Sequence, residues 1–358
     1  MSTISKVLPI KPDADDIALS RSDPALGRPD PRKLARSLNA YTQPSVARSL
    51  IELAITFIPF AAIFAGILWA VYAGYYLALA GVPLASLFLL RLFIIQHDCS
   101  HGSFLPGRSG NARVGRMLGV LTLTPFTYWR RTHALHHAST GNLDARGFGD
   151  VDTLTIDEFT SLPRWRRLGY RIYRHPAVLL GVAPAYLFLL QHRYPMGLAR
   201  EGWRYWASTL TTTVVAIAML GGLAWATSPM ALALVYFPTL ILAASIGVWL
   251  FYVQHQFEGA HWKTKPDWEF HEAAMAGSTC LDLPPFMRWF TGNIGIHHIH
   301  HLASRIPFYR LSEALNAHPE LKHFNRMTVT DAMASLRLAL WDDRSGRLVS
   351  FREARHAA

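Results

Sequence analysis

Histidines with the spacing of metal ligands gather in three short motifs of this 358-residue sequence. HDCSH begins at residue 97, HALHH at residue 133 and HHIHH at residue 297. In the last two motifs, positions i, i+3 and i+4 lie on one face of a helix, so we expect the three rings of each motif to point to one common site. Imidazole binds zinc, copper, iron and nickel. The candidate metal ligands are His97, His101, His133, His136, His137, His297, His300 and His301.

The remaining histidine of the third motif, His298, is out of phase with the others. It lies about 100° around the helix from His297. We therefore predict that His298 faces away from the metal site. On this interpretation His298→Ala retains the metal, whereas His300→Ala loses activity.

The HxxHH spacing occurs twice in the chain, which isolated surface histidines do not explain. Eight ligands exceed what one ion can use, so two ions are expected. A zinc hydrolase is disfavoured because the chain has no HExxH motif. The ExxH spacing of a carboxylate-bridged di-iron bundle occurs at Glu258–His261 and Glu320–His323. We interpret both pairs as surface coincidences.

Two long apolar runs must position these motifs. No charged residue occurs from Leu53 to Leu90 or from Tyr205 to Phe257, and each run is about twice the ~20 residues that one helix needs to cross the hydrocarbon layer. Each run is therefore predicted to form a helical hairpin, over about 48–96 and 205–254. A metal transporter would place ligands near the bilayer midplane. Here the motifs follow helix ends, which favours a reaction centre at the membrane surface.

Lys and Arg lie on one side of the predicted hairpins. The expected hairpin turns, at 71–81 and 224–230, contain neither residue. By the positive-inside rule, both termini and all three motifs are cytoplasmic and the two turns face outward. The formal net charge of +11 is explained by a basic face near anionic lipid, so we expect no nucleic-acid partner.

The predicted fold class is an all-α integral membrane protein. Four transmembrane helices form two hairpins, and interfacial helices and a cytoplasmic helical cap accompany them, the cap holding a site for two metal ions. We expect a flexible arm at 1–45, a membrane domain at 46–345 and a tail at 346–358. The cytoplasmic parts of the domain are expected at 97–204 and 255–345.

Short apolar stretches at 114–126 and 176–190 are too short to span the membrane and are predicted to be interfacial helices. The pattern at 328–341 predicts an amphipathic surface helix. Only two cysteines occur, Cys99 and Cys280. They can form neither a disulfide framework nor a four-cysteine iron–sulfur site.

The three motifs, together with YWRRTHALHHASTGNLDARGFGDVDTLT (128–155) and HHIHHLASRIPFYRL (297–311), resemble the histidine boxes of the membrane-bound fatty acid desaturase family. The similarity covers about 48–345 and is greatest to the bacterial acyl-lipid Δ12 (ω-6)-like branch. It implies a non-haem centre of two iron ions that uses O2 to introduce a cis double bond into a membrane-associated acyl chain. A location in the bacterial inner membrane is also implied.

The same family commonly recruits one more histidine just beyond the fourth transmembrane helix. In this chain FYVQHQFEGAHW (251–262) offers His255 at that place, with His261 as its rival. The resemblance favours His255 as the ninth ligand.

Acidic residues near the motifs are candidate partners of the ligand imidazoles. A carboxylate that accepts a hydrogen bond from the second ring nitrogen fixes the orientation of a metal-bound histidine. Solvated loop positions are the alternative for each of them. The candidates are Asp98, Asp144, Asp150 and Asp152.

Electrons must come from another protein, because the chain has no haem-attachment motif, no cysteine cluster and no dinucleotide-binding fingerprint. A ferredoxin or a cytochrome b5-like protein is the expected donor. Its acidic surface could be steered by a group of arginines that could equally bind lipid headgroups. They are Arg108, Arg113, Arg116, Arg130 and Arg131.

Aromatic residues beside the motifs are candidates to line a tunnel for the acyl chain, with interfacial anchoring as the alternative. They are Phe104, Trp129, Phe290 and Tyr309. Within the same class of di-iron enzyme, the alternative function is a hydroxylase that acts on acyl chains, alkanes or carotenoids. The sequence leaves the oligomeric state open.

Overall fold

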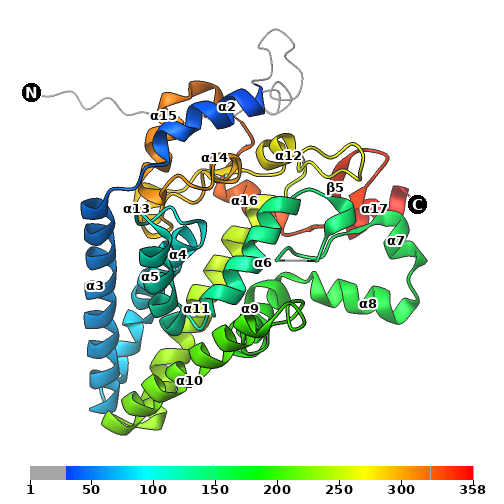
Figure 1. Ribbon diagram of the computed structural model, residues 1–358. Coiled ribbons are helices and arrows are strands. Elements are labelled where there is room, and N and C mark those ends of the chain that lie inside the picture. The colour runs from blue at the N-terminus through cyan, green and yellow to red at the C-terminus, as the bar shows by residue number, and fades with distance from the viewer. Residues whose placement is uncertain (1–29, 148, 323, 358) are drawn as a thin grey trace, which may run out of the picture.

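The computed structural model describes residues 30–147, 149–322 and 324–357. Four of its helices are long and apolar enough to cross a membrane. They form two hairpins that stand beside one another under a cap of short helices (Figure 1). The prediction of four membrane-spanning helices is therefore confirmed. These helices are α3 (Val46–Tyr72), α4 (Val82–His101), α10 (Trp203–Ala226) and α11 (Pro229–His255).

The chain turns between the paired helices at residues suited to ending and starting helices. After α3, Gly74 takes a φ of 91°, which residues with a Cβ rarely adopt, and the 3-10 helix η2 (Tyr76–Gly81) leads into α4. Between α10 and α11, the Ser228 side chain accepts a hydrogen bond from the Ala231 amide and Pro229 opens the helix. The hairpins thus need only short connections.

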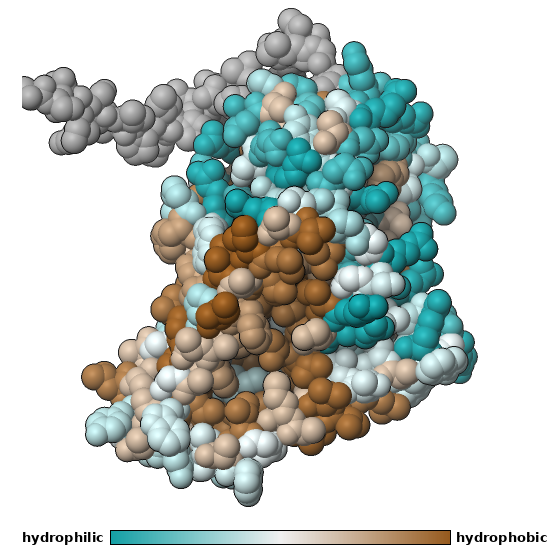
Figure 2. All heavy atoms as spheres, turned by 60° about the vertical axis from the view of Figure 1, so that its left-hand side comes forward, coloured by the Kyte–Doolittle hydropathy of each residue, from teal (hydrophilic) through white to brown (hydrophobic). Residues whose placement is uncertain are grey.

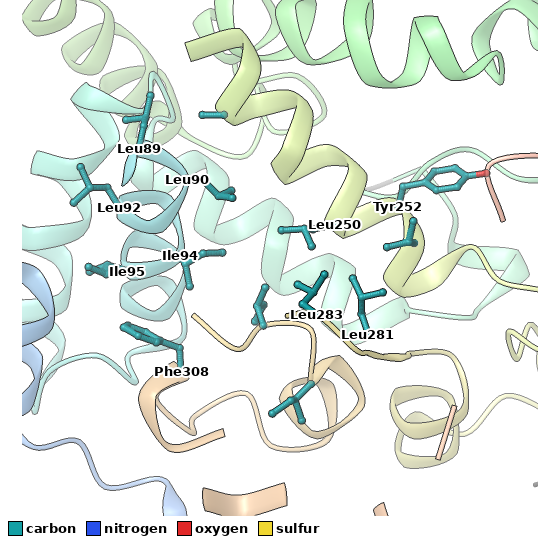
Figure 3. Packing of buried hydrophobic residues seen from close by; sticks show 14 of the residues in the cluster. Leu89, Leu90, Leu92, Ile94, Ile95, Leu250, Tyr252, Leu281, Leu283 and Phe308 are labelled. Carbon is teal, nitrogen blue, oxygen red and sulfur yellow. The ribbon is translucent and has the colours of Figure 1, made fainter. Parts of the chain in front are cut away.

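Helices α3, α4 and α11 pack against one another through leucine, isoleucine and aromatic side chains. Figure 3 shows Leu90 and Ile94 of α4 directed toward Leu250 of α11, with Phe308 of the cap below Ile95. The outer faces of α3 and α10 instead carry exposed apolar residues such as Ile58 and Val214. Figure 2 shows this apolar surface as a broad brown area beneath a polar, teal cap. Such a division fits a membrane-embedded lower part.

Two further pairs of helical segments accompany the spans. In the first, α5 (Arg108–Leu121) meets α6 (Phe126–Ser139) closely because Gly115 and Gly119 lack side chains. A Cβ at Gly119 would lie 2.4 Å from the Thr124 carbonyl oxygen. In the second, α8 (Arg164–Tyr173) is bent by 59° from the helical segment Val178–Arg193. That segment contains the π-helix η4 (Val178–Val182), α9 (Ala183–Leu189) and the 3-10 helix η5 (Gln191–Arg193).

The cap consists of short helices and two small sheets (Figure 1). One sheet has the order β1–β4–β5, with β1 parallel and β5 antiparallel to β4, and the other pairs β2 with β3 in parallel. The strands are β1 (Leu154–Thr155), β2 (Cys280–Leu281), β3 (Arg326–Met327), β4 (Leu338–Asp342) and β5 (Arg347–Ser350). The helices are α7 (Ile156–Ser161), α12 (Phe270–Ala276), α13 (Pro285–Phe290), α14 (His297–Leu302), α15 (Leu311–Ala317), α16 (Val329–Ser335) and α17 (Phe351–Ala357).

The surface helix predicted over 328–341 is only half correct. Helix α16 ends at Ser335, and Leu338–Asp342 form strand β4 between β1 and β5. Backbone pairing with β5, which follows directly, and with β1, from a distant part of the chain, decides this segment. Its own periodicity could not reveal this pairing.

The expected arm at 1–45 lies partly outside the described residues, which begin at residue 30. Its described part forms α2 (Pro31–Leu38) and the 3-10 helix η1 (Asn39–Tyr41). Leu34 and Leu38 are buried, and the Arg32 guanidinium lies 3.1 Å from the Glu269 carboxylate beside α12. The expected tail at 346–358 contains β5 and α17.

Candidate metal centre

Four helices bring the candidate ligands together from distant parts of the sequence. The last turn of α4 carries His97 and His101, and α11 ends at His255. Helix α6 carries the second motif and α14 the third. Helix α4 ends immediately after its second histidine because Gly102 adopts a left-handed conformation with φ of 70°. Each motif therefore lies at or near a helix end, where the spans meet the cap.

The histidines form two groups, and within each group the ligand atoms all lie within 4.8 Å of one another. The first group has five members and the second has four. The first group is His97, His101, His133, His137 and His300. The second group is His136, His255, His297 and His301.

The rings of one motif do not all point to one site, contrary to our expectation. In each HxxHH motif the i and i+4 histidines share a group, while the i+3 histidine belongs to the other. The reason is helical phase: positions i and i+4 are about 40° apart, but i+3 and i+4 are about 100° apart. The second motif therefore contributes His136 to the second group, and the third motif contributes His300 to the first. Each of these two motifs therefore supplies ligands to both groups.

The distances between ring nitrogens suit shared metal coordination. In the first group, His101 Nε2 lies 3.3 Å from His97 Nε2 and 3.0 Å from His133 Nε2. In the second, His297 Nε2 lies 3.0 Å from His255 Nε2. Nitrogens that each stand about 2.1 Å from one ion are roughly 3 Å apart when they subtend a right angle. The rings are thus spaced as ligands around an ion would be.

The site is buried, which favours the neutral form of an imidazole. All nine rings lie in buried or nearly buried positions. Burial, and then the neighbouring histidines, hold the pKa of His133, His137, His297, His300 and His301 well below the usual value. A neutral imidazole has a free lone pair, which is the form that binds a metal ion.

Several buried ring nitrogens have no hydrogen-bond partner among the described residues. They include both nitrogens of His300 and of His301, together with His136 Nε2. Buried polar atoms without partners are rare in native proteins and indicate a missing ion or water. A metal ion bound by one nitrogen of each ring would satisfy that nitrogen, and the second nitrogen of His300 and of His301 would carry the proton.

Two of the predicted acidic partners contact ligand candidates. Asp150 Oδ1 is hydrogen-bonded to His136 Nδ1, and Asp98 Oδ1 lies 3.4 Å from His97 Nδ1. The other Asp98 oxygen accepts a hydrogen bond of 2.6 Å from the Phe308 amide. A third ring is held by a backbone group: His255 Nδ1 lies 3.0 Å from the Gly277 carbonyl oxygen. These contacts direct Nε2 of each ring toward the centre.

The other two acidic candidates are placed elsewhere. Asp144 accepts a hydrogen bond from the Lys265 amide. Asp152 is bound through its backbone, whose amide donates to the Tyr173 hydroxyl. Neither carboxylate has a contact with a histidine among those found in the described residues.

The structure also separates the remaining histidine alternatives. His255 belongs to the second group, whereas His261 belongs to neither. His298 is fully buried but lies outside both groups, with Nε2 3.1 Å from the Leu321 carbonyl oxygen. Trp129 stacks on the His133 ring at 4.6 Å.

An apolar cavity of about 370 Å³ reaches both histidine groups. It touches His97 and His133 of the first group and His297 of the second. Its volume lies within the roughly 300–1,000 Å³ of ligand pockets. Just over half of its lining residues come from α4, α9 and α11, and many of these are leucine or phenylalanine. A larger, more open cavity of about 570 Å³ beside α8 reaches none of the nine histidines.

Most of the lining could not be foreseen from proximity to the motifs. Of the four aromatic residues predicted to line a tunnel, only Trp129 lines this cavity. The α11 face does so through residues three or four apart, from Leu240 through Gly247 to Gln254. That periodicity is present in the sequence, but an apolar helix offers no signal for which face adjoins a cavity.

Comparison with known proteins identifies the family. Residues 67–330 match the model of the fatty acid desaturase family. The chain belongs to this family. It is 38% identical to a fatty acid desaturase of Bacillus subtilis over 325 residues, which are 91% of this chain and 92% of that relative. The protein is therefore a desaturase-family enzyme with a histidine-rich metal site, and its four apolar helices make it a membrane protein.

More distant relatives are named with greater detail. The sn-1 acyl-lipid ω-3 desaturase (ferredoxin) of Synechocystis is 31% identical over 242 residues, 63% of each chain. The corresponding protein of Nostoc is 29% identical over the same share of each chain. The resemblance found in the sequence is thus confirmed.

Proposed function

We propose that the protein desaturates a membrane-associated fatty acyl chain, using two iron ions held by the nine histidines, with O2 as co-substrate. The observation that carries this proposal is the apolar cavity that reaches both histidine groups. An acyl chain is itself apolar and partitions into such a cavity from the membrane. Held there, its carbon atoms would lie beside the metal site.

Two bound iron ions would supply the O2-dependent oxidation of an unactivated C–H bond, which no side chain can perform alone. The protein holds the ligands and keeps water away. Gln254, which lines the cavity, donates a hydrogen bond of 3.1 Å to the Ile294 carbonyl oxygen. This bond joins the end of α11 to the chain just before the third motif. It thereby helps to fix His255 relative to His297 and His301, the other side of the second group.

The position of the new double bond stays a prediction. The resemblance of the motifs favours Δ12 (ω-6), while several relatives are named ω-3 acyl-lipid desaturases. We propose an acyl chain carried on a membrane lipid as the substrate, in line with those names.

An external one-electron carrier completes the reaction. We propose a ferredoxin, because two relatives carry that donor in their names, with a cytochrome b5-like protein as the alternative. We also propose that the termini and the metal centre face the cytoplasm of a bacterial inner membrane, since both hairpin turns lack Lys and Arg.

Expression in a bacterial host rich in monounsaturated lipid tests the function directly. Fatty acid methyl esters are then analysed by mass spectrometry with location of the double bonds. A new diene that is absent with His300→Ala supports desaturation, and its position separates ω-6 from ω-3. A hydroxy acid in place of the diene would identify a hydroxylase and overturn the proposal, as would an unchanged lipid profile with iron-loaded protein.

A further inference from the structure

We propose that Arg174 is a positioning residue for the second histidine group, holding His255 and the Asp150–His136 pair in register so that the second ion binds. This inference rests on the proposed metal centre. Arg174 lies just after α8, far in sequence from every histidine motif, and its side chain is buried, with only 3% exposed. No sequence motif marks it.

The Arg174 guanidinium joins segments that lie on either side of the second group. Nη2 donates to Gln256 Oε1 at 2.9 Å and to the Tyr252 hydroxyl at 3.2 Å. These residues flank His255 at the end of α11. Nη1 donates to the Asp152 carbonyl oxygen at 3.1 Å. That carbonyl is two residues beyond Asp150, the partner of His136.

A direct link between the same two segments depends on this arrangement. Gln256 Nε2 donates to Thr153 Oγ1 at 3.1 Å. The Gln256 amide oxygen accepts from Arg174 at 2.9 Å and also lies 3.3 Å from Thr153 Oγ1, so the Gln256 amide contacts both Arg174 and Thr153. Arg174 also lies 3.4 Å from Thr153 Oγ1. The three side chains form a closed triangle between the α11 end and the loop that carries Asp150.

Arg174 carries its charge without a paired acid. Its partners are neutral carbonyl, amide and hydroxyl oxygens, and no carboxylate forms an ion pair with it in the described part of the chain. A buried cation without a counter-ion is costly to fold, so a simple packing role would be served better by an apolar side chain. The two terminal nitrogens of the guanidinium bind all these acceptors between them, which the single ammonium of a lysine could not do.

The consequence is selective for one of the two groups. The segments that Arg174 joins carry His255 itself and Asp150, the partner of His136. His255 and His136 are two of the four members of the second group. His97 and His101 of the first group are on α4, which it does not contact through any of these bonds. Removing the Arg174 side chain should therefore weaken binding of the second ion and leave binding of the first ion unchanged.

The test is ferrous-iron binding by the purified full-length protein under anaerobic conditions, measured as ions per chain without any assay of turnover. We expect two ions in the wild type. In Arg174→Met we expect the affinity for the second ion to fall at least 10-fold, in the range found when outer-sphere partners of metal ligands are removed. The affinity for the first ion should be unchanged. Arg174→Lys keeps the charge but has fewer donors, and should be intermediate.

Arg193→Met is the matched control. Arg193 is also an arginine that donates to neutral acceptors, among them Thr213 Oγ1 at 3.2 Å. Among the described residues, none of its hydrogen bonds reaches either segment beside the second group. We expect it to bind two ions with wild-type affinity. Wild-type binding by Arg174→Met, or equal loss of both ions in Arg174→Met and Arg193→Met, would overturn the inference.

Gln256→Leu provides a second route if Arg174→Met does not fold. It removes the amide between Arg174 and Thr153 while leaving the arginine in place. We expect the same selective weakening of binding of the second ion. Normal binding of both ions would contradict the positioning role of Arg174. A wild-type protein that binds fewer than two ions would instead contradict the proposed di-iron centre itself.

Discussion

Helical phase separates neighbouring histidines of α14 into different roles. His300 contributes to the first group, with both ring nitrogens unpartnered among the described residues. His298, two residues earlier, is hydrogen-bonded to the Leu321 carbonyl and lies next to Phe324 at a ring distance of 6.3 Å. Burial alone therefore does not identify a ligand, because both rings are fully buried. The direction of the ring decides.

Replacing each of these two histidines by alanine should give opposite metal results. His300→Ala removes a ligand of the first group, and we expect loss of iron and of activity. His298→Ala should retain two ions, although it should destabilise the fold by about 1–3 kcal/mol because the Leu321 carbonyl loses its partner. Metal analysis together with thermal unfolding distinguishes the two. If His298→Ala loses the metal as completely as His300→Ala, the assignment by phase is wrong.

Asp150 and Asp152 offer a similar comparison within one loop. Of these two aspartates, only Asp150 has a carboxylate that contacts a histidine of the two groups, through His136 Nδ1. Asp150→Asn should therefore weaken iron binding by about 10–100-fold. Asp152→Asn, the control, should bind iron normally because its side chain has no such contact. Equilibrium iron titration of both variants checks this, and equal affinities would remove Asp150 from the site.

At the scale of elements, α4 and α11 form both the wall of the cavity and the support of the ligands. Leu90 and Gly247 face each other across their interface. Counting seven residues toward the cap leads to His97 on α4 and Gln254 on α11, about 10 Å nearer the metal site at 1.5 Å per residue. The same two helices therefore fix the distance between the bound chain and the ions.

Gly247→Leu should obstruct this cavity without disturbing the metal. A Cβ at Gly247 would lie 3.5 Å from Leu90 Cδ1, so a longer side chain must occupy cavity space. We expect a large loss of desaturation with two ions retained. Gly222→Leu on α10 is the control, because a Cβ there meets nothing within 4 Å, and it should keep full activity. Unchanged products with Gly247→Leu would show that the acyl chain lies elsewhere.

A buried ion pair joins α3 to α4. Arg91 binds the Glu52 carboxylate and the Trp289 carbonyl, and each charged side chain is only 2% exposed. Arg91 also donates to Thr56 Oγ1 at 3.1 Å and lies 4.1 Å from the Trp289 ring centre. The pair therefore connects the first hairpin to α13 of the cap.

Breaking this pair should be strongly destabilising. Glu52→Ala leaves the buried Arg91 charge uncompensated, and we expect a loss of about 3–5 kcal/mol. Arg48 also pairs with Glu52, at 2.8 Å, but is 57% exposed, so Arg48→Ala should cost at most about 1 kcal/mol. Thermal unfolding in detergent compares the two variants. Equal stabilities would mean that Glu52 does not stabilise Arg91.

The molecule as a whole has a polar cap above an apolar lower part (Figure 2). The exposed arginines of α5 and α6, the histidine groups and the described part of both terminal segments belong to the end of the spans at which α3 begins and α4 ends. The hairpin turns lie at the opposite end (Figure 1). Positive charge thus accumulates on one side of the predicted membrane plane.

Cysteine labelling in intact cells tests this orientation. Leu77 and Trp225, in the two hairpin turns, are 89% and 91% exposed, and the native Cys99 and Cys280 are buried. We expect an impermeant maleimide to label Leu77→Cys and Trp225→Cys from outside. It should label the exposed cap variant Lys265→Cys only after lysis. Labelling of the cap variant in intact cells would show that the orientation is the opposite of the one proposed.

The sequence by itself determined the four spans, the histidine-rich site and the family. Apolar runs and helical spacing are local properties, so they can be read from residues close together along the chain. Even the exclusion of His298 follows from one helical angle.

Only the tertiary structure decided how the histidines divide between two groups, that His255 and not His261 joins the second, and that Asp150 and not Asp152 contacts a ligand. It also decided the β4 pairing, the cavity and the contacts of Arg174. These features depend on how helices cross and on contacts between separate segments of the chain, such as the contact between Thr153 and Gln256, which are 103 positions apart. Helical phase fixes the angle between two rings, but only packing fixes which other rings they meet.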